Sequence, residues 1–262
     1  MLREKENVLR KLYETIDRYY PDDVEVDYKK YLETSGIINL LNQQGNLTFL
    51  IDVKHLRIIH MSGSIQNFTG YKIEEFGTNI LSKFMDILAP KHHLFLNVFV
   101  SWSLNILKTF PIEYKSKQFM SVWGLKLYHK NQRSMKWYLN IVPLEFNDDK
   151  NPTLIAISIQ EITHLIKGND YIIRAEFTEK ENSKKIFVYY SDEDKTIEHD
   201  IISEREREVL QHISQGLNTK QIAEKLHITK NTVDNHRRNM LARTGTRDTT
   251  ALIQLCRMTA IL

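Results

Sequence analysis

Cysteine and long apolar runs are scarce in this chain of 262 residues. The only cysteine is Cys256, so no disulfide can form within the chain, which favours a reducing, cytoplasmic setting. No apolar run approaches the ~20 residues of a membrane-spanning helix. The first ten residues, MLREKENVLR, contain no apolar signal-peptide core. We therefore expect a cytoplasmic protein with no membrane contact.

Motifs for catalysis and metal binding are also missing from the sequence. There is no Gly-rich phosphate loop and no G-x-S-x-G sequence. A single cysteine cannot supply a zinc-finger ligand set, and the carboxylates are scattered with no pair that stands out. The sequence therefore offers no candidate catalytic or metal-binding residues, so we expect a protein that is not an enzyme and holds no metal.

The net charge of +3 is concentrated at the C-terminal end. Residues 200–262 contain ten Lys or Arg and seven Asp or Glu, so the rest of the chain is neutral. A basic excess confined to one segment favours contact with phosphates. Because the excess is small, we expect one copy to bind DNA weakly and two copies to bind it better.

Three short helical patterns follow one another in residues 203–243. Ser203 and Glu206 have the spacing of a capping box at the start of the first. Asn218 with Gln221 can cap the second helix in the same way, and Thr229 can cap the third. The breaks between these helices are brief, which is typical of a small helical DNA-binding domain.

The third helix has an inner and an outer face. At about 100° per residue, Val233, His236 and Met240 lie together and are expected to point inward. The polar residues that could bind base edges are Asn231, Asp234, Asn235 and Arg238. The residues expected to contact phosphates are Lys220, Lys230, Thr232 and Arg237. Asp234 lies on a flank, where it either accepts from cytosine or repels phosphates. A helix, a tight break and a second helix with such a face form a helix-turn-helix.

The runs S-E-R-E-R-E-V-L, G-L-N-T-K-Q-I-A-E-K-L and T-V-D-N-H-R-R-N-M-L closely resemble the LuxR-type helix-turn-helix domain. The resemblance covers about residues 201–262. It departs from the family at Asn218-Thr219, where Ser-Asn is usual, and at Thr246, where an aliphatic residue is usual. Sigma-factor region 4 shares part of the pattern, and a small structural helical bundle is the alternative. The resemblance implies that DNA is the partner, that the last helix can pair with a second copy, and it allows contact with RNA polymerase. That last helix, expected from Asp248 to about Met258, has Leu252, Leu255 and Cys256 at close helical spacing. A four-helix domain of about 60 residues is too small to hide them all, so we expect a second copy to cover them.

Residues 1–20 are predicted to form a helix. Leu2, Leu9, Leu12, Ile16 and Tyr19 give it a partial apolar stripe. The stripe either packs on the next domain or forms a dimer seam. A second helical segment is expected over residues 28–41.

Residues 46–165 contain a strand pattern interrupted by helices. A hairpin is expected over 47–63, a long helix over 91–107, and three strands over 119–129, 135–145 and 153–160. This order predicts an antiparallel sheet with helices on one side.

The same region resembles a PAS domain. F-T-G-Y at 68–71, K-x-Q-x-S-M-K-W at 130–137 and Q-E-I-T at 160–163 match its motifs in order and spacing. Departures are His92, where Asp is common, and Asn131-Gln132, where Asp-Gly is common.

PAS domains often hold a ligand, which raises three possibilities here. Light-sensing flavin versions need a cysteine within the domain, and Cys256 lies outside it. Haem-binding versions use a histidine on the long helix, for which His92 and His93 are weak candidates, because a solvated helix-start position is the more ordinary role. The aromatic residues that either line a small-molecule pocket or are simply core are Phe84, Phe95, Phe99, Trp123 and Trp137.

The predicted architecture is α+β with four segments. A further hairpin is expected at 170–190, with no assigned role, and residues 191–200 are expected to be an exposed linker. The segments are an N-terminal helical cap at 1–45, a PAS-like sensory domain at 46–165, a hairpin and charged linker at 166–197, and a LuxR-type domain at 198–262. This organisation predicts a dimeric transcription regulator that binds double-stranded DNA. The alternatives are a PAS module whose helical domain contacts protein, and a haem or small-ligand sensor.

Overall fold

The computed structural model describes residues 2–20, 28, 46–62, 65–76, 80–113, 118–179 and 183–262. The helix expected over residues 28–41 lies outside the described part of the chain, apart from Tyr28 itself. Among the described residues, no helix is both long enough and apolar enough to cross a membrane.

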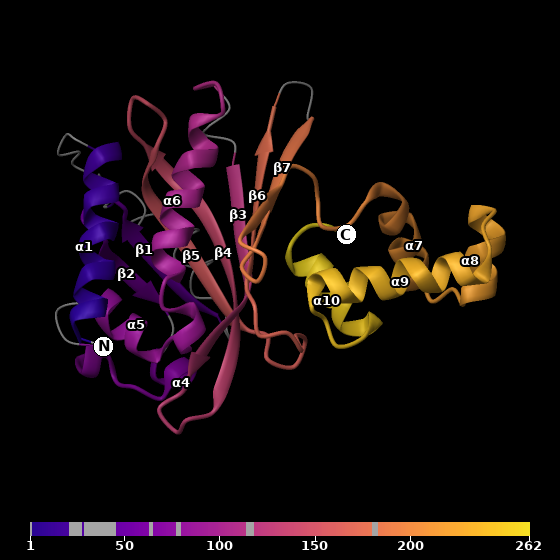
Figure 1. The fold of residues 1–262 in the computed structure, drawn as a ribbon, viewed down its shortest axis with the longest axis horizontal. Coiled ribbons are helices and arrows are strands. Elements are labelled where there is room, and N and C mark those ends of the chain that lie inside the picture. Colours follow the sequence, from indigo (N-terminus) through magenta and orange to yellow (C-terminus); the bar gives the residue numbers. More distant parts are fainter. Residues whose placement is uncertain are drawn as a thin grey trace.

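One antiparallel sheet of eight strands forms the centre of the molecule (Figure 1). Its strands are β1 Leu47–Asp52, β2 Arg57–Ser62, β3 Gln118–Tyr128, β4 Ser134–Phe146, β5 Pro152–Glu161, β6 Ile172–Thr178, β7 Lys184–Tyr190 and β8 Lys195–Ile197. The order across the sheet is β2-β1-β5-β4-β3-β6-β7-β8. The expected antiparallel sheet is therefore confirmed, and the hairpin at 170–190 extends it beyond β3.

Helices cover one face of this sheet (Figure 1). They are α1 Leu2–Tyr19, α4 Ile65–Thr69, α5 Ile80–Ile87 and α6 Phe95–Lys108, with short 3-10 turns η1 Ile73–Phe76 and η2 Pro90–His92. α1 packs on α6 and buries Leu12 and Ile16 in the core of its own chain. Because these apolar positions are already covered, the structure supports intrachain packing, rather than a dimer seam, for the stripe predicted in residues 1–20.

Four further helices form the C-terminal domain on the opposite side of the sheet (Figure 1). They are α7 Glu204–Ser214, α8 Thr219–Leu226, α9 Lys230–Thr244 and α10 Thr249–Met258. The predicted caps are confirmed. Ser203–Glu206 and Asn218–Gln221 form capping boxes, and the Thr229 side chain accepts from the backbone N–H of Thr232. α8 lies at the end of the domain farthest from the sheet.

The outer face of the sheet packs directly on the C-terminal domain. Trp123, Tyr138 and Ile172 from the sheet share one buried cluster with Leu252 and Leu255 of α10. The Tyr138 hydroxyl donates a hydrogen bond of 2.8 Å to the carbonyl of Met258. The apolar side of α10 is thus covered within the chain, which corrects the expectation that a four-helix domain would leave it in need of a second copy.

The segment at 191–200 is more ordered than an exposed linker. Most of its side chains are exposed, but Lys195–Ile197 forms β8 against β7. At its end, the Asp200 carboxylate is 8% exposed and accepts from the Arg174 guanidinium of β6 at 3.0 and 3.1 Å. This ion pair between distant parts of the sequence makes the segment part of the fold.

A buried histidine near the start of α6 joins three segments of the chain through its ring nitrogens. His92 is 1% exposed, its Nδ1 accepts from the Lys126 backbone N–H at 2.9 Å, and its Nε2 donates to the Asn169 carbonyl at 2.9 Å. With both ring nitrogens engaged, His92 has no nitrogen left for a haem iron. His93 is half-buried, with its Nε2 3.2 Å from the Leu88 carbonyl oxygen.

We expect His92 to make the protein sensitive to mild acid. Burial lowers its pKa below the ordinary value of 6.5, so between the lowered pKa and 6.5 the unfolded chain binds more protons than the folded one. The free energy of unfolding should therefore fall as pH drops through this window. Urea titrations at neutral and mildly acidic pH should show a smaller loss in His92→Gln than in the wild type. His164→Gln, at an exposed position, should keep the full loss; an unchanged pH response in His92→Gln would contradict the assignment.

Candidate nucleic-acid interface and ligand pocket

The inner face of α9 anchors the helix-turn-helix. Val233 and Met240 are both fully buried, in one cluster with Leu210 of α7 and Ile222 of α8. His236, the third residue expected inside, is half-buried. This packing holds α9 against the two preceding helices and fixes which of its sides faces solvent.

The outer face of α9 presents the predicted base-reading residues to solvent. Asn231, Asp234, Asn235 and Arg238 are all exposed. Arg238 donates to the Asn235 side-chain oxygen at 2.9 Å, so the two groups lie together on this face. Amide and guanidinium groups can each form paired hydrogen bonds with a base edge in the major groove. Their role in DNA binding remains a prediction.

The predicted phosphate-contacting residues differ in how freely they can move. Lys220 and Lys230 are exposed at the starts of α8 and α9. Thr232 is half-buried and its hydroxyl lies 2.8 Å from that of the cap residue Thr229. Arg237 is also half-buried and donates to the Thr249 hydroxyl at 3.1 Å. Thr232 and Arg237 therefore help to hold the domain together in addition to any contact with phosphate.

Two arginines of this domain bind groups on other helices and so stabilise its fold, which the sequence spacing does not reveal. Arg243, at the end of α9, forms an ion pair with Glu206, the capping-box carboxylate of α7. Burial alone would raise the pKa of Glu206, but bonds from Arg243 and Ser203 outweigh it and lower that pKa. Arg205 donates to the carbonyl of Leu226 at the end of α8 at 2.6 Å. These contacts bring together residues that are 21 or more positions apart in the sequence, where helical periodicity has no reach.

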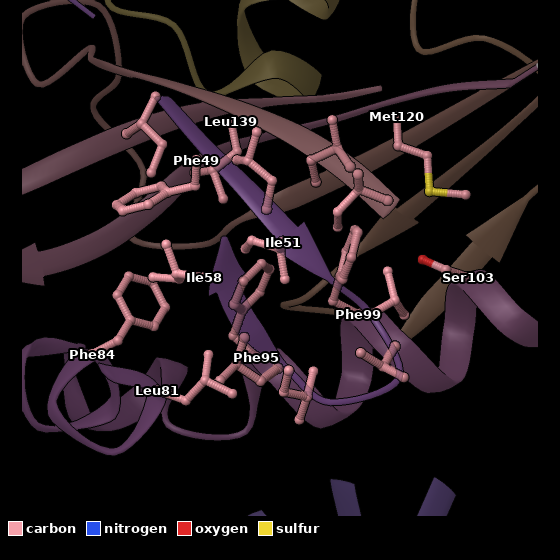
Figure 2. Close-up of a pocket in the computed structure, with 18 of the residues that line it drawn as sticks. Phe49, Ile51, Ile58, Leu81, Phe84, Phe95, Phe99, Ser103, Met120 and Leu139 are labelled. Carbon is pink, nitrogen blue, oxygen red and sulfur yellow. The ribbon is translucent and has the colours of Figure 1, made fainter. Parts of the chain in front are cut away.

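A cavity of about 190 Å³ lies between the sheet and the helices that cover it. Phe84, Phe95, Phe99 and Trp137 are on its lining, as Figure 2 shows for the three labelled phenylalanines. Trp123 is not, which corrects its place among the predicted pocket residues. It lies on the other face of the sheet, in the cluster with the C-terminal domain.

A β-bulge accounts for the position of Trp123. The pairing of β3 with β4 shifts between Trp123 and Leu125, at Gly124, whose φ is +83°. A Cβ at this position would lie 2.4 Å from the Asp170 carbonyl oxygen, so only glycine fits. Because the extra residue reverses the alternation, Leu125 faces the covering helices while Trp123 faces the C-terminal domain.

Residues 200–256 match the model of a family described as bacterial regulatory proteins of the luxR family. The C-terminal domain is of the LuxR type. Within this LuxR-type domain, the chain is 51% identical over 49 residues to the transcriptional regulatory protein LnrK of Bacillus subtilis (strain 168). That match covers 19% of this chain and 22% of LnrK, so the chain spans about a fifth of that relative. Both similarities are to regulatory proteins, and LnrK is described as a transcriptional one.

Whole-chain comparison finds weaker similarity to solved structures. A phage VqmA in complex with DPO is 12% identical, with a TM-score of 0.32 and coverage of 88% of each chain. A Vibrio cholerae VqmA dimer, solved in the absence of its target DNA, is 13% identical, with a TM-score of 0.31 and coverage of 86% of this chain and 88% of that one.

Proposed function

We propose that this protein is a sequence-specific DNA-binding transcription regulator. The observation that carries the proposal is the exposed face of α9, where Asn231, Asn235 and Arg238 stand on a capped and packed helix of a LuxR-type domain. The net charge of this segment is positive, as contact with phosphates requires. In a helix-turn-helix, the second helix enters the major groove and its exposed side chains contact base edges.

We further propose that the N-terminal domain is a PAS-like sensor. Supporting this are the motif order in residues 46–165, the antiparallel sheet with helices on one face, and the cavity between them. Strand β4 can couple the cavity to the DNA-binding domain, because successive side chains of a strand point to opposite faces of the sheet. Trp137 lines the cavity, and the next residue, Tyr138, donates to the Met258 carbonyl of the LuxR-type domain. A change at the cavity can therefore move the surface on which the C-terminal domain rests.

The regulator is proposed to act as a dimer on DNA. Dimers of helix-turn-helix proteins contact half-sites about one helical turn (~34–36 Å) apart, so the spacing of two α9 helices controls affinity. The small positive excess of the domain gives one copy little affinity from phosphates alone. We propose that the signal acts by changing the arrangement of the two copies.

An electrophoretic mobility shift with genomic fragments tests the function. We expect a subset of fragments to shift at physiological salt and to resist competition by unrelated DNA. If no fragment shifted selectively, the alternative of a PAS module whose helical domain contacts protein would be favoured. Sedimentation of the free and DNA-bound protein tests the dimer, and a monomer in both states would exclude the proposed mechanism.

The exposed face of α9 predicts a difference between two substitutions. Arg238→Ala should cost ~1–3 kcal/mol on the selected site and relax the preference at one base position. Lys220→Ala, a matched loss of one exposed cation, should weaken all sequences alike and reduce the salt slope by about one. Binding titrations over a range of salt concentrations and base substitutions measure both. An unchanged site preference in Arg238→Ala would show that this face does not contact bases.

A further inference from the structure

We propose that the cavity between α6 and the sheet binds a small, uncharged and largely hydrocarbon molecule. The proposal rests on the proposed sensory function for the consequence of binding, and on the lining of the cavity for the binding itself. Three properties of the cavity define the ligand: its size, the chemistry of its walls, and one buried hydroxyl group.

The size of the cavity restricts the ligand to a few rings or a short chain. Its volume is about 190 Å³. An apolar cavity of about 150 Å³ stays dry and binds benzene, whereas sites for drug-sized ligands measure roughly 300–1,000 Å³. The space therefore suits a molecule somewhat larger than benzene and is too small for haem or a flavin.

The walls exclude a charged ligand. Among the described residues, none of those that line the cavity is Asp, Glu, Lys, Arg or His. Most of the lining side chains are aliphatic or aromatic, among them Leu81, Phe95 and Ile157, and the neutral side chain of Gln118 is also on the lining. A carboxylate, phosphate or ammonium group held against these walls would have no opposite charge beside it, which is far more costly than burying a neutral group. Water is also a poor occupant, because a buried water needs two to four polar partners.

One hydroxyl group on the wall is available to a ligand. Ser103 of α6 is 8% exposed, and its Oγ has no hydrogen-bond partner among the described residues. Figure 2 shows this oxygen pointing from α6 into the group of lining side chains, between Phe99 and Met120. The other lining hydroxyls are engaged: Tyr20 donates to the Pro152 carbonyl and Thr69 to the Ile65 carbonyl, each at 2.7 Å. Trp137 is also on the lining, and its indole Nε1 has no hydrogen-bond partner among the described residues. Ser103 supplies the lining hydroxyl that can bind a polar group on an otherwise apolar ligand.

Three probes with one carbon skeleton test these properties separately. Toluene, p-cresol and p-toluate share a methyl-substituted ring and carry no polar group, a neutral hydroxyl and a carboxylate, respectively. Calorimetric titration of the full-length protein at neutral pH should show binding of toluene and p-cresol and none of p-toluate. A failure of both neutral probes to bind at millimolar concentration, or equal binding of p-toluate, would overturn the proposal.

Two variants locate the binding within the cavity. Ser103→Ala should lower the affinity for p-cresol about five-fold, the effect of one hydrogen bond, and leave toluene unaffected. Equal affinity for p-cresol in this variant would overturn the role of Ser103. Val100→Phe adds a ring to a lining position. It should abolish binding of both neutral probes and leave the melting temperature unchanged. A folded Val100→Phe protein that still bound both probes would place the site elsewhere. If Val100→Phe failed to fold, the Ser103→Ala comparison would decide the proposal. Selective DNA shifts are measured on the same preparation, so loss of the regulatory function is distinguished from loss of the ligand site.

Discussion

Val233→Asp is expected to unfold the LuxR-type domain of the full-length protein. Val233 is fully buried on the inner side of α9, in the cluster that contains Leu210 and Ile222. A carboxylate at this position would be buried without a partner, a change that costs more than about 4 kcal/mol when the site cannot relax. We expect loss of helical circular dichroism at a temperature where the wild-type protein is folded, together with loss of any DNA shift.

An exposed position on the same helix provides the control. Asn239→Asp introduces the same carboxylate on the solvent side of α9, where surface substitutions usually change stability by about 0.5 kcal/mol or less. The two variants carry equal charge, so their difference measures the effect of the buried position, which combines the lost packing of valine with the unpaired carboxylate. A Val233→Asp protein that melted like Asn239→Asp would place Val233 outside the core.

Features set by neighbouring residues could be predicted from the sequence. The capping boxes at Ser203 and Asn218 are defined by residues three positions apart, and both are present in the structure. The strands and the long helix of residues 46–165 were also expected, because periodicity is a local property. The same holds for the inward and outward faces of α9, which alternate with the turn of a single helix.

Features that depend on distant residues could not be predicted in this way. Trp123 was a candidate for either the pocket or the core. It lies in the core beside the C-terminal domain, because the bulge at Gly124, which depends on the close approach of Asp170, reverses the alternation. The apolar side of α10 was expected to need a second copy, whereas Tyr138 and its neighbours on the sheet cover it. Asp200 was expected in an exposed linker, because its segment is rich in charged residues. Its partner Arg174 lies 26 positions earlier, so the local sequence gives no sign of the ion pair.

Arg174, the partner of Asp200, occupies the centre of a charge network between the sheet and the LuxR-type domain. Its guanidinium, 1% exposed, bonds Asp200 through two nitrogens and Glu176 at 2.8 Å. Arg207 of α7 donates to Asp200 at 3.2 Å and to the carbonyl of Ile261 at 2.6 Å. Burial alone would raise the pKa of Glu176, but bonds from Lys184 and Arg174 outweigh it and lower that pKa. The network therefore joins β6, the segment before α7 and the C-terminal end.

Arg174→Met should destabilise the protein by about 3–5 kcal/mol, because it leaves the Asp200 carboxylate buried without its main partner. Urea unfolding of the full-length protein measures the change. Arg133→Met removes an arginine whose pair with Glu161 is exposed, and it should cost about 1 kcal/mol or less.

Arg174→Met combined with Asp200→Leu should recover part of the loss, because replacing both partners of a buried pair with apolar groups is often neutral. If the double variant were no more stable than Arg174→Met, the loss would come from the packing of the arginine and not from an uncompensated carboxylate. If Arg174→Met itself matched Arg133→Met, the network would not hold the two domains together.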